Sequence, residues 1–530
     1  MKSNLMRISM ILLLLLSASG ILAAETKTFI REYSYQASEL DSKVSCRAIA
    51  LALVKRLLLE EAGTYLESET EVRNYQLTKD QITVLTAGVV RAELLNEKWD
   101  GKTYYIQAKL EVNPKEVEQS IQKLRQDKQK TKELEEAKIK VNALLQEIEE
   151  LKKKVPSAKV AQSKSVSYMK AVNKLRAIEL CERAVSQALT LTYEESIGLF
   201  SEAIELDPTF IDPYYWRAWR YADMGRRRML TYGNKDQQAL TFYRKALKDY
   251  DKIIQLKPQS NFYAWALSGS GHVYQELGDY KRAIKDYSEA IRRDHKDYTH
   301  YYYRSSAYNS MGEYEKAYAD ITKAIELEPS HPFLNLEECR GDIAFKLKNY
   351  KVAIADYSKT INIIESRVSD RYCADGVLKV SPSGQIVEEC PGREILEDSY
   401  RRGLSLVYCK RGQVYASLGS RTQAISDFSK SIDLLEAFSS YFCRGQMYFS
   451  EGKYEFAVSD FSKALNIKGG QWLLEHLNNY NYYLSEAYYG RGYARIKLDQ
   501  RDPGIEDMKA AARLNFKLAQ DHLTSKGISW

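Results

Sequence analysis

A sequence motif repeats from about residue 165 onward, and this repetition limits the possible folds of the chain more than any other feature. In its clearest copy, residues 301–329, the turn glycine is Gly312, which lies 34 residues after Gly278, the turn glycine of the preceding copy. Self-similarity at this period is typical of helix pairs that stack and bury a continuous apolar core between neighbours. We therefore predict a mainly α-helical array over residues 165–514.

The clearest copy carries a fixed order of large, small, aromatic and turn residues. The residues that fill this order are Tyr301, Ser305, Tyr308, Gly312, Tyr314, Ala317, Ile321, Ala324 and Pro329. The order resembles the tetratricopeptide (TPR) repeat, and about eight copies can be counted. The resemblance implies an α-solenoid in which small residues let helix A and helix B of each pair approach closely, while aromatic residues fill the gaps between pairs. The 40 tyrosines of the chain fit that expectation.

Two insertions interrupt the array, at residues 226–237 and 365–402, and residues 515–530 no longer follow the motif. Insertions in solenoids become loops, often on the binding face, and we assign 515–530 to a helix that caps the end of the stack. In the second insertion, Cys373 and Cys390 are candidates for a disulfide in an oxidising compartment. The alternative is a passive surface loop with two free thiols.

The N-terminus has the layout of a cleavable signal peptide, which we place at residues 1–24. Two basic residues precede an apolar run over 8–16, and the small pair Ala23 and Ala24 follows. We therefore expect an exported protein, periplasmic or secreted. No later stretch approaches the roughly 20 apolar residues of a membrane helix. The net charge of +7 is a mild excess for this length and does not indicate nucleic acid.

Residues 25–113 alternate between the periods of strands and helices, which predicts a small α+β domain. We expect a helix over 41–62 that is capped by Asp41 or Ser42 and stopped by Gly63, and a hairpin turn at Asp100-Gly101. The other expected elements are strands over 28–36, 89–95 and 103–112, a further strand, and a short helix near 79–85.

This domain carries a second resemblance. The segments LDSKVSCRAIAL and LTKDQITVLTAGVVRAELLNEKWDGKTYYIQAKLEV are similar to the N-terminal domain of flagellar assembly protein T and of related envelope lipoproteins. The resemblance implies a periplasmic assembly module without a catalytic role.

Residues 114–156 are charged and contain a seam of apolar residues at steps of three and four, which predicts a helical or coiled-coil linker. The seam consists of Leu134, Ala137, Val141, Leu144, Ile148, Leu151 and Val155. Two interpretations remain open. The seam forms a homodimer through 134–155, or it belongs to a single helix that lies against a neighbour in the same chain.

Arginines recur just before the small residue of helix A, and aspartates recur in helix B. The arginines are Arg217, Arg304, Arg340, Arg411, Arg444 and Arg491, and the aspartates are Asp320, Asp356, Asp427, Asp460 and Asp507. A ladder of arginines suits an acidic ligand, yet the matching carboxylates favour structural ion pairs between stacked helices. We predict the structural role.

The TPR resemblance also implies a concave groove lined by set positions of helix A. Those positions hold Trp219, Trp265, His272, Tyr302, Asn309, Gln413, Phe442, Gln446, Phe449, Tyr489 and Tyr493. Such a groove is aromatic and mostly uncharged, and it lacks the Lys and Asn combination with which co-chaperone members of the family hold a C-terminal carboxylate. We expect it to bind an extended or helical segment of another envelope protein. In the alternative, half of these aromatics pack against the next repeat.

No catalytic, cofactor-binding or metal-binding motif is recognisable. Ser268-Gly269-Ser270-Gly271 comes nearest to a catalytic glycine motif, but it occupies the close-packing position of a repeat, and the histidines share no helical face with carboxylates. We predict a non-enzymatic scaffold or adaptor of the cell envelope, without cofactors. The alternatives are a structural subunit of an envelope or flagellar-type assembly and a glycan-active enzyme, for which no paired carboxylates can be assigned.

Overall fold

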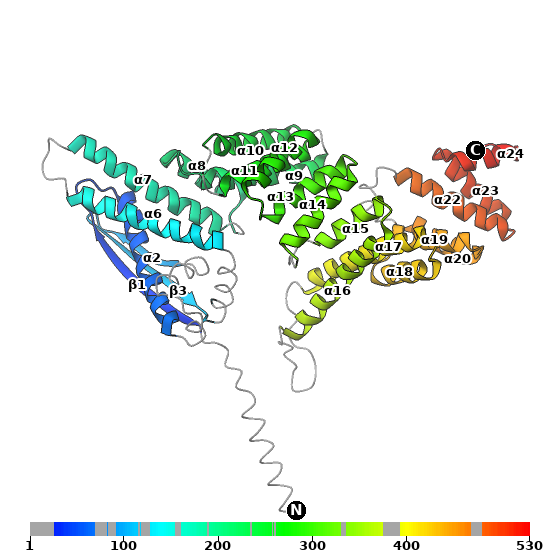
Figure 1. Ribbon diagram of the computed structural model, residues 1–530, viewed down its shortest axis with the longest axis horizontal. Coiled ribbons are helices and arrows are strands. Elements are labelled where there is room, and N and C mark those ends of the chain that lie inside the picture. The colour runs from blue at the N-terminus through cyan, green and yellow to red at the C-terminus, as the bar shows by residue number, and fades with distance from the viewer. Residues whose placement is uncertain are drawn as a thin grey trace, which may run out of the picture. The chain divides into compact units, whose positions relative to one another are not determined.

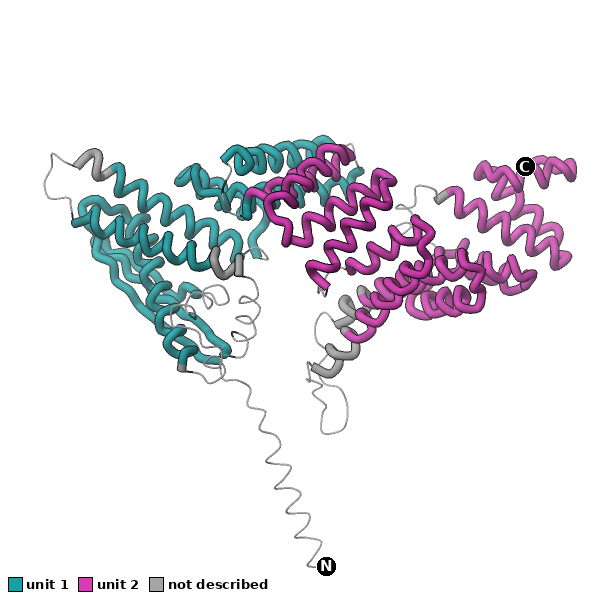
Figure 2. The backbone as a smooth tube through the Cα atoms, viewed as in Figure 1, with its two compact units in different colours: residues 1–262 teal, residues 263–530 magenta. Residues whose placement is uncertain are grey.

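The chain forms two compact units, Met1–Phe262 and Tyr263–Trp530 (Figure 2). The computed structural model describes residues 26–68, 82, 92–114, 117, 128–153, 161–187, 190–233, 236–256, 258, 261–329, 335–374, 393–467 and 480–530. The predicted signal peptide and most of the short helix expected near 79–85 lie outside these residues.

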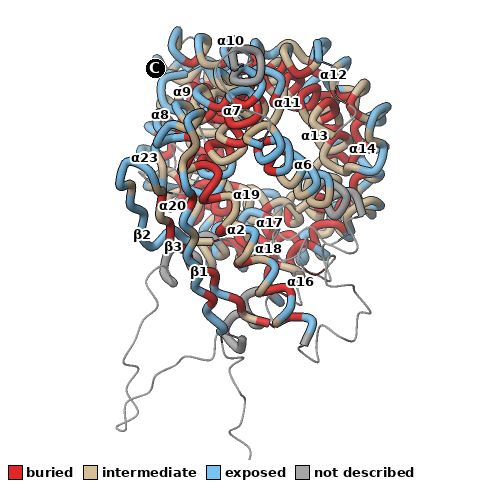
Figure 3. The backbone as a smooth tube through the Cα atoms, turned by 90° about the vertical axis from the view of Figure 1, so that its left-hand side faces the viewer, coloured by how far each residue is buried: buried red, intermediate tan, exposed pale blue. Residues whose placement is uncertain are grey.

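Unit 1 begins with a three-stranded antiparallel sheet in the order β1-β3-β2. Its strands are β1 (Lys27–Gln36), β2 (Glu93–Trp99) and β3 (Thr103–Val112). The hairpin turn between β2 and β3 is confirmed. Gly101 has a φ of 99°, and the Asp100 carboxylate accepts hydrogen bonds from the backbone N–H groups of Lys102 and Thr103 at 2.8 and 2.6 Å. Residues 89–91 of the predicted strand over 89–95 lie outside the described residues. Strand β2 covers the rest of that prediction from Glu93 on, continues to Trp99, and is exposed along nearly its whole length (Figure 3).

Helix α2 (Lys43–Ser68) packs on this sheet and is longer than predicted. Its start agrees with the sequence, because the Ser42 hydroxyl accepts a hydrogen bond from the backbone N–H of Ser45 at 3.2 Å. The predicted stop at Gly63 is wrong. Leu66, one turn beyond that glycine, is fully buried, so continuing the helix adds apolar surface to the core.

Two long helices, α6 (Lys128–Lys153) and α7 (Ala161–Ser186), pack against one another (Figure 1), and α7 contacts α2. The seam predicted in the linker lies on α6. Leu144 and Ile148 of that seam are buried in the N-terminal core, and Val141 and Leu151 pack against it. These contacts agree with the single-helix interpretation, and the homodimer stays a prediction.

Helix α7 belongs to two hydrophobic cores. Tyr168, Val172 and Leu175 lie in the core of the sheet and α2, whereas Leu180 and Ala184, further along the same helix, lie in the core of the first helix pair. The Tyr168 hydroxyl also donates a hydrogen bond to the Asp41 carboxylate, which precedes α2. One continuous helix therefore joins the α+β core to the repeats.

The rest of the described chain consists of helix pairs, as the repeat period predicts. Unit 1 continues with α8 (Tyr193–Leu206), α9 (Asp212–Tyr232) and α10 (Gln237–Leu256). The helices of the second unit are α11 (Phe262–Glu276), α12 (Tyr280–Arg293), α13 (Tyr298–Ser310), α14 (Tyr314–Leu327), α15 (Leu336–Lys346), α16 (Tyr350–Ala374), α17 (Arg393–Ser417), α18 (Arg421–Leu434), α19 (Phe438–Ser450), α20 (Tyr454–Asn466), α22 (Tyr480–Lys497), α23 (Arg501–Arg513) and α24 (Lys517–Ser525).

The first insertion is mostly helical, so the loop expected over 226–237 is wrong. Helix α9 continues to Tyr232 and α10 starts at Gln237. Ion pairs support the added turns: Arg226 and Arg227 contact Asp223 at 2.8 and 2.9 Å, and Arg228 contacts Asp236 at 2.8 Å. Asp223 on the same helix and Asp236 just before α10 thus offset the charge of the arginine cluster.

At the second insertion, α16 extends to Ala374 and α17 begins at Arg393, so both ends of the segment are helical. Cys390 and the side chain of Cys373 lie outside the described residues, and their disulfide stays a prediction. The predicted terminal helix is present as α24, whose Ala519 and Leu523 are fully buried against α23. None of the helices, over the residues that the structure describes, is long and apolar enough to cross a membrane.

Candidate functional site

Several helix pairs are built around a close contact between a glycine and an aromatic ring sixteen residues later. A Cβ added to Gly271 would lie 2.8 Å from Cε1 of Tyr287, and one added to Gly412 would lie 2.7 Å from Cε1 of Phe428. At such distances an added Cβ would force the ring to shift, so glycine is favoured there. In α13 and α14 the same two positions hold Ser305 and the smaller Ile321. The sequence therefore identified the close-packing slot correctly.

The recurring arginines and aspartates form bidentate ion pairs. In each pair the guanidinium donates from Nε and Nη2 to the two carboxylate oxygens at 2.7–2.9 Å. The side chains are only 14–21% exposed on the arginines and 4–10% on the aspartates. Arg217 pairs with Asp249, which the sequence pattern missed because the insertion doubles the usual spacing of 16 residues. The predicted structural role agrees with this geometry.

Five of these arginines also make a third contact, which ties them to helix B of the preceding repeat. Nη1 of Arg304 donates to the Ser288 hydroxyl at 3.0 Å, and Nη1 of Arg444 donates to that of Ser429 at 2.9 Å. The remaining donor and acceptor pairs are Arg217 with Ser201, Arg411 with Ser358 and Arg491 with Ser462. We call each arginine with its Asp and Ser partners a clamp. With every Nη1 engaged, these arginines are poor candidates for an acidic ligand.

The residues expected to line a groove lie on the A helices, and we call the side of each A helix that carries them the A-helix face. Most of them are half-buried. At the C-terminal end they form an aromatic cluster with two rings that the sequence did not single out, Tyr482 and Phe516. Ring centroids are 5.5 Å apart for Phe449 and Tyr493, 5.1 Å for Tyr489 and Phe516, and 6.0 Å for Tyr482 and Phe516. We call these five residues the C-terminal aromatic cluster.

Polar residues of the A-helix face bond to the next repeat. Nε2 of Gln446 donates to Oε1 of Glu486 at 3.0 Å, and Asn309 Oδ1 accepts from Lys346 Nζ at 3.0 Å. Burial raises the pKa of Glu486, and the bond from Gln446 works against that rise. Nε2 of Gln413 lies 3.7 Å from the sulfur of Cys443. These side chains are therefore already engaged within the stack.

The remaining predicted groove residues differ in exposure. Trp219 is 44% exposed, the most open of the set, while Trp265 donates from Nε1 to Asp297 at 3.3 Å. His272 packs its ring on Tyr303 at 5.6 Å. Burial raises the pKa of Tyr302 to about 12, as expected for a phenol that packs against its neighbours.

Phe442 does not line an accessible surface. It is only 4% exposed and lies in the core with Phe438, Phe461 and Tyr483. For this residue the groove assignment is wrong and the packing alternative is correct. The reason is that Phe461 lies beside it and the two rings fill one space between repeats.

The A-helix face also carries more charge than predicted. Lys410 Nζ contacts Oε1 of Glu338 at 2.7 Å and Oδ2 of Asp342 at 2.8 Å, linking α17 to α15. The sequence contained the signal, because the groove positions of the copy around Gly341 fall on Glu338 and Asp342.

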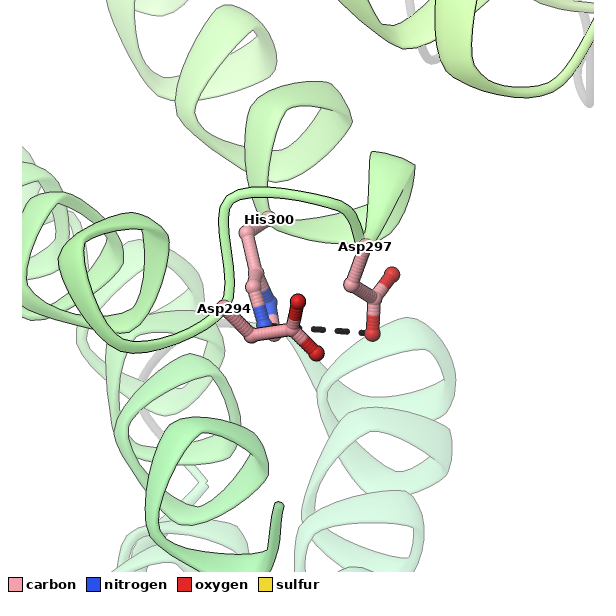
Figure 4. Close-up of side chains that lie close together, drawn as sticks. All are labelled: Asp294, Asp297 and His300. Carbon is pink, nitrogen blue, oxygen red and sulfur yellow. Dashed lines mark ion pairs between the residues drawn. The ribbon is translucent and has the colours of Figure 1, made fainter. Parts of the chain in front are cut away.

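A second group that the sequence did not indicate lies at the turn between α12 and α13, where Asp294, Asp297 and His300 converge (Figure 4). One possible ligand atom from each lies within 4.8 Å of the others. His300 is fully buried, and this burial lowers its pKa, so the imidazole is neutral at neutral pH. A pattern of histidines and carboxylates on one helical face does not reveal such a group, because its residues lie around a turn.

Known proteins resemble this chain in its repeats. The tetratricopeptide repeat family matches residues 264–297, 301–331 and 406–434, which coincide with α11–α12, α13–α14 and part of α17 with α18. DnaJ homolog subfamily C member 7 of Homo sapiens is 22% identical over 305 residues, 48% of this chain and 61% of that protein. Hsp70-Hsp90 organizing protein 3 of Arabidopsis thaliana is 31% identical over 132 residues, 23% of each.

The chain thus spans less than two thirds of the length of these curated relatives. Among solved structures, a tetratricopeptide repeat protein from Parabacteroides merdae is 16% identical, with 57% of this chain and 97% of that chain covered and a TM-score of 0.34. The described helix pairs and the matched segments agree on one point. Stacked TPR helix pairs form the repeat region of this chain.

Proposed function

We propose that this chain, whose TPR repeats form an α-solenoid, is a non-catalytic adaptor that binds a segment of another protein through its C-terminal aromatic cluster. The observation that carries the proposal is the partial exposure of these rings. Tyr482 is 52% exposed while its ring packs on Phe516, so its position is fixed before a partner arrives. Pre-ordered aromatic side chains are the residues that contribute most to protein interfaces.

The chemistry of this surface favours a partner segment with apolar side chains. Phe449, Tyr482, Tyr489, Tyr493 and Phe516 carry no charge at neutral pH, and Tyr hydroxyls supply hydrogen bonds to a peptide backbone. Glu486, the carboxylate that the Gln446 amide contacts, adds one acidic group beside the rings. An extended or helical segment that offers one or two large apolar residues satisfies these groups.

Site-specific photocrosslinking tests the proposal. A photoreactive phenylalanine analogue at Tyr482 is expected to capture a discrete partner, whereas the same analogue at Phe456 is not. Phe456 is a matched control because it is an exposed aromatic, 58%, on helix α20, a B helix. Tyr482→Ala is expected to weaken binding of the captured partner by at least about tenfold. Equal capture from both positions would contradict an aromatic-cluster site.

The proposal includes export to the periplasm or beyond. Its support is the basic start, apolar run and Ala23-Ala24 pair at the N-terminus. N-terminal sequencing of the protein from fractionated cells is expected to begin at Glu25 in the exported fraction. An intact Met1 in the cytosolic fraction would remove this part of the proposal and leave the binding function untouched.

We propose further that the N-terminal α+β domain docks the adaptor to an envelope assembly. Its support is the resemblance of residues 25–113 to periplasmic assembly modules, together with the exposed strand β2. Deleting the domain with α7 left intact would destroy a shared core, so point changes on β2 are the better test. Leu95→Lys, at a position 43% exposed, is expected to reduce co-purification with envelope components and leave the fold intact. The findings do not favour the alternatives of a structural subunit or a glycan-active enzyme.

A further inference from the structure

The cluster between α12 and α13 has an arrangement that packing alone does not require. His300 occupies a position that recurs in every repeat, five residues before the close-packing residue. The buried residues there in other repeats are Ala266, Leu336, Val407, Ser440 and Ala487. An imidazole in a slot that elsewhere takes aliphatic or small residues introduces a polar group that needs a partner.

Only one of the two imidazole nitrogens has such a partner. Nδ1 of His300 lies 2.7 Å from the Ser268 hydroxyl on α11, a normal hydrogen bond. Nε2 is buried and makes no hydrogen bond, and Oδ2 of Asp297 lies 3.8 Å away, beyond hydrogen-bonding distance. Figure 4 shows the ring directed toward the carboxyl groups of Asp294 and Asp297. The buried nitrogen therefore faces two carboxylates without bonding to either.

We propose that Asp294, Asp297 and His300 form a binding site for a divalent transition-metal ion of the zinc type. Imidazole nitrogen and carboxylate oxygen together are ligands that Zn²⁺ accepts, whereas Mg²⁺ and Ca²⁺ prefer sites made of oxygen alone. In the tautomer that carries its hydrogen on Nδ1, the ring donates to the Ser268 hydroxyl and the lone pair of Nε2 is left for the metal. A hydrogen bond to the other ring nitrogen is the usual support of a metal-bound histidine.

The distances fit this ion. Ligands of a tetrahedral zinc lie about 3.4 Å from one another, given bonds of about 2.0–2.1 Å. The three candidate ligand atoms are within 4.8 Å of one another, and the separation of Nε2 and Oδ2 of Asp297 is already 3.8 Å. Small rotations of two half-buried carboxylates close the remaining gap. Three protein ligands leave a fourth position for water or for a group from a partner.

Neighbouring contacts hold the ligands near this geometry. Asp297 caps α13 through Oδ1, which accepts from the backbone N–H and the hydroxyl of Thr299 at 2.9 and 2.6 Å. Its other oxygen accepts from Trp265 Nε1 at 3.3 Å. Asp294 accepts a backbone hydrogen bond from Lys296 at 3.1 Å. The cap and the turn therefore keep both carboxylates close to the His300 ring.

Zinc titration of the metal-free full chain, followed by calorimetry, tests the site. His300→Leu is the ligand-loss variant, and Leu336 at the same position of α15 indicates that the fold accepts leucine there. His295→Asn is the matched control, because His295 is exposed in the same turn but outside the cluster. The wild type and His295→Asn are expected to bind one zinc ion at this site. His300→Leu and Asp294→Asn are expected to bind it at least about tenfold more weakly.

Cobalt(II) separates this site from the cysteines. Nitrogen and oxygen ligands give the bound ion weak visible bands, whereas a thiolate adds an intense charge-transfer band. Circular dichroism checks that His300→Leu is folded. The proposal is overturned if wild type and His300→Leu bind zinc alike, if the wild type binds none, or if the cobalt spectrum carries the thiolate band.

Discussion

The helix pairs α11–α12 and α13–α14 follow the same motif but are held together differently. In α13–α14, Arg304 clamps Asp320 and reaches Ser288 in the preceding helix B. In α11–α12 the arginine position holds Ser270, whose hydroxyl donates to Asp286 at 2.8 Å. Close packing is thus common to both pairs, while the clamp is an addition that spans three helices. Close packing is therefore what a helix pair needs in order to form, whereas the clamp fixes the pair to the preceding repeat.

Removing a clamp carboxylate is expected to have the largest effect on this comparison. Asp427→Ala leaves the Arg411 guanidinium, 16% exposed, with the Ser358 hydroxyl as the one clamp partner left to it. A buried charge that loses its counter-ion costs about 3–5 kcal/mol. Native-state hydrogen exchange of α17 and α18 amides measures this loss locally, without assuming that the whole array unfolds together.

Asp286→Ala is the matched change in the repeat without a clamp. It removes the hydrogen bond from Ser270, and we expect a smaller loss, about 1 kcal/mol. Equal losses for Asp427→Ala and Asp286→Ala would mean that the arginine adds nothing to what the carboxylate already contributes.

Close packing, by contrast, is expected to be equally sensitive in both kinds of repeat. Gly271→Ala and Gly412→Ala place a Cβ at 2.8 and 2.7 Å, respectively, from the ring of the partner aromatic, and overpacking of this kind costs about 1–3 kcal/mol. Thermal denaturation of the two variants measures the loss. Phe428→Ile should restore much of the stability of Gly412→Ala, since Ile321 faces Ser305 in α14. A markedly smaller cost for Gly271→Ala would indicate looser packing where the clamp is absent.

A partly exposed ion pair extends the comparison to charges outside the clamps, and its removal is expected to have a smaller effect than removal of a clamp carboxylate. Burial alone would raise the pKa of Asp223, but the Tyr193 hydroxyl, Arg226 and Arg227 lower it to about 2. A carboxyl whose pKa is lowered on folding stabilises the protein above its unfolded pKa of about 4 and loses this contribution as the pH falls through 2.

Asp223→Asn is therefore expected to cost about 1–2 kcal/mol at pH 7, a discounted value because both arginines are at least half exposed. The difference from the wild type should shrink steadily between pH 4 and 2. Urea unfolding at several pH values measures it. A loss that does not depend on pH would assign the effect to packing and not to charge.

Much of the array was predictable because its signal is local and repeated. The close contacts at Gly271, Gly412 and Gly445 favour very small residues, so glycine returns there at fixed spacing. The Arg and Asp partners were visible for the same reason. Their serine partners were not, because they belong to the preceding repeat and lie 15 to 53 residues before the arginine, as for Ser429 with Arg444 and Ser358 with Arg411.

Features that depend on how neighbouring side chains pack in the folded chain were predicted less well. Phe442 satisfies the rule for a groove position, yet a neighbouring Phe461 fills the space beside it. Gly63 usually ends a helix, but the burial of Leu66 outweighs that preference. The cluster around His300 combines residues from a turn and two helices, and no single periodicity connects them. Local sequence patterns identify the repeat positions, whereas burial in the folded array decides which of these positions remain accessible to a partner.

Helix α7 has a consequence for how the N-terminal half of the molecule loses its structure. A helix of 26 residues is about 39 Å long, and it contributes to two cores along that length. Melting either core exposes apolar residues of a helix on which the other depends. We expect the α+β core and the first helix pair to unfold as one cooperative unit. A protease or a pulling force then encounters a single unfolding barrier for both.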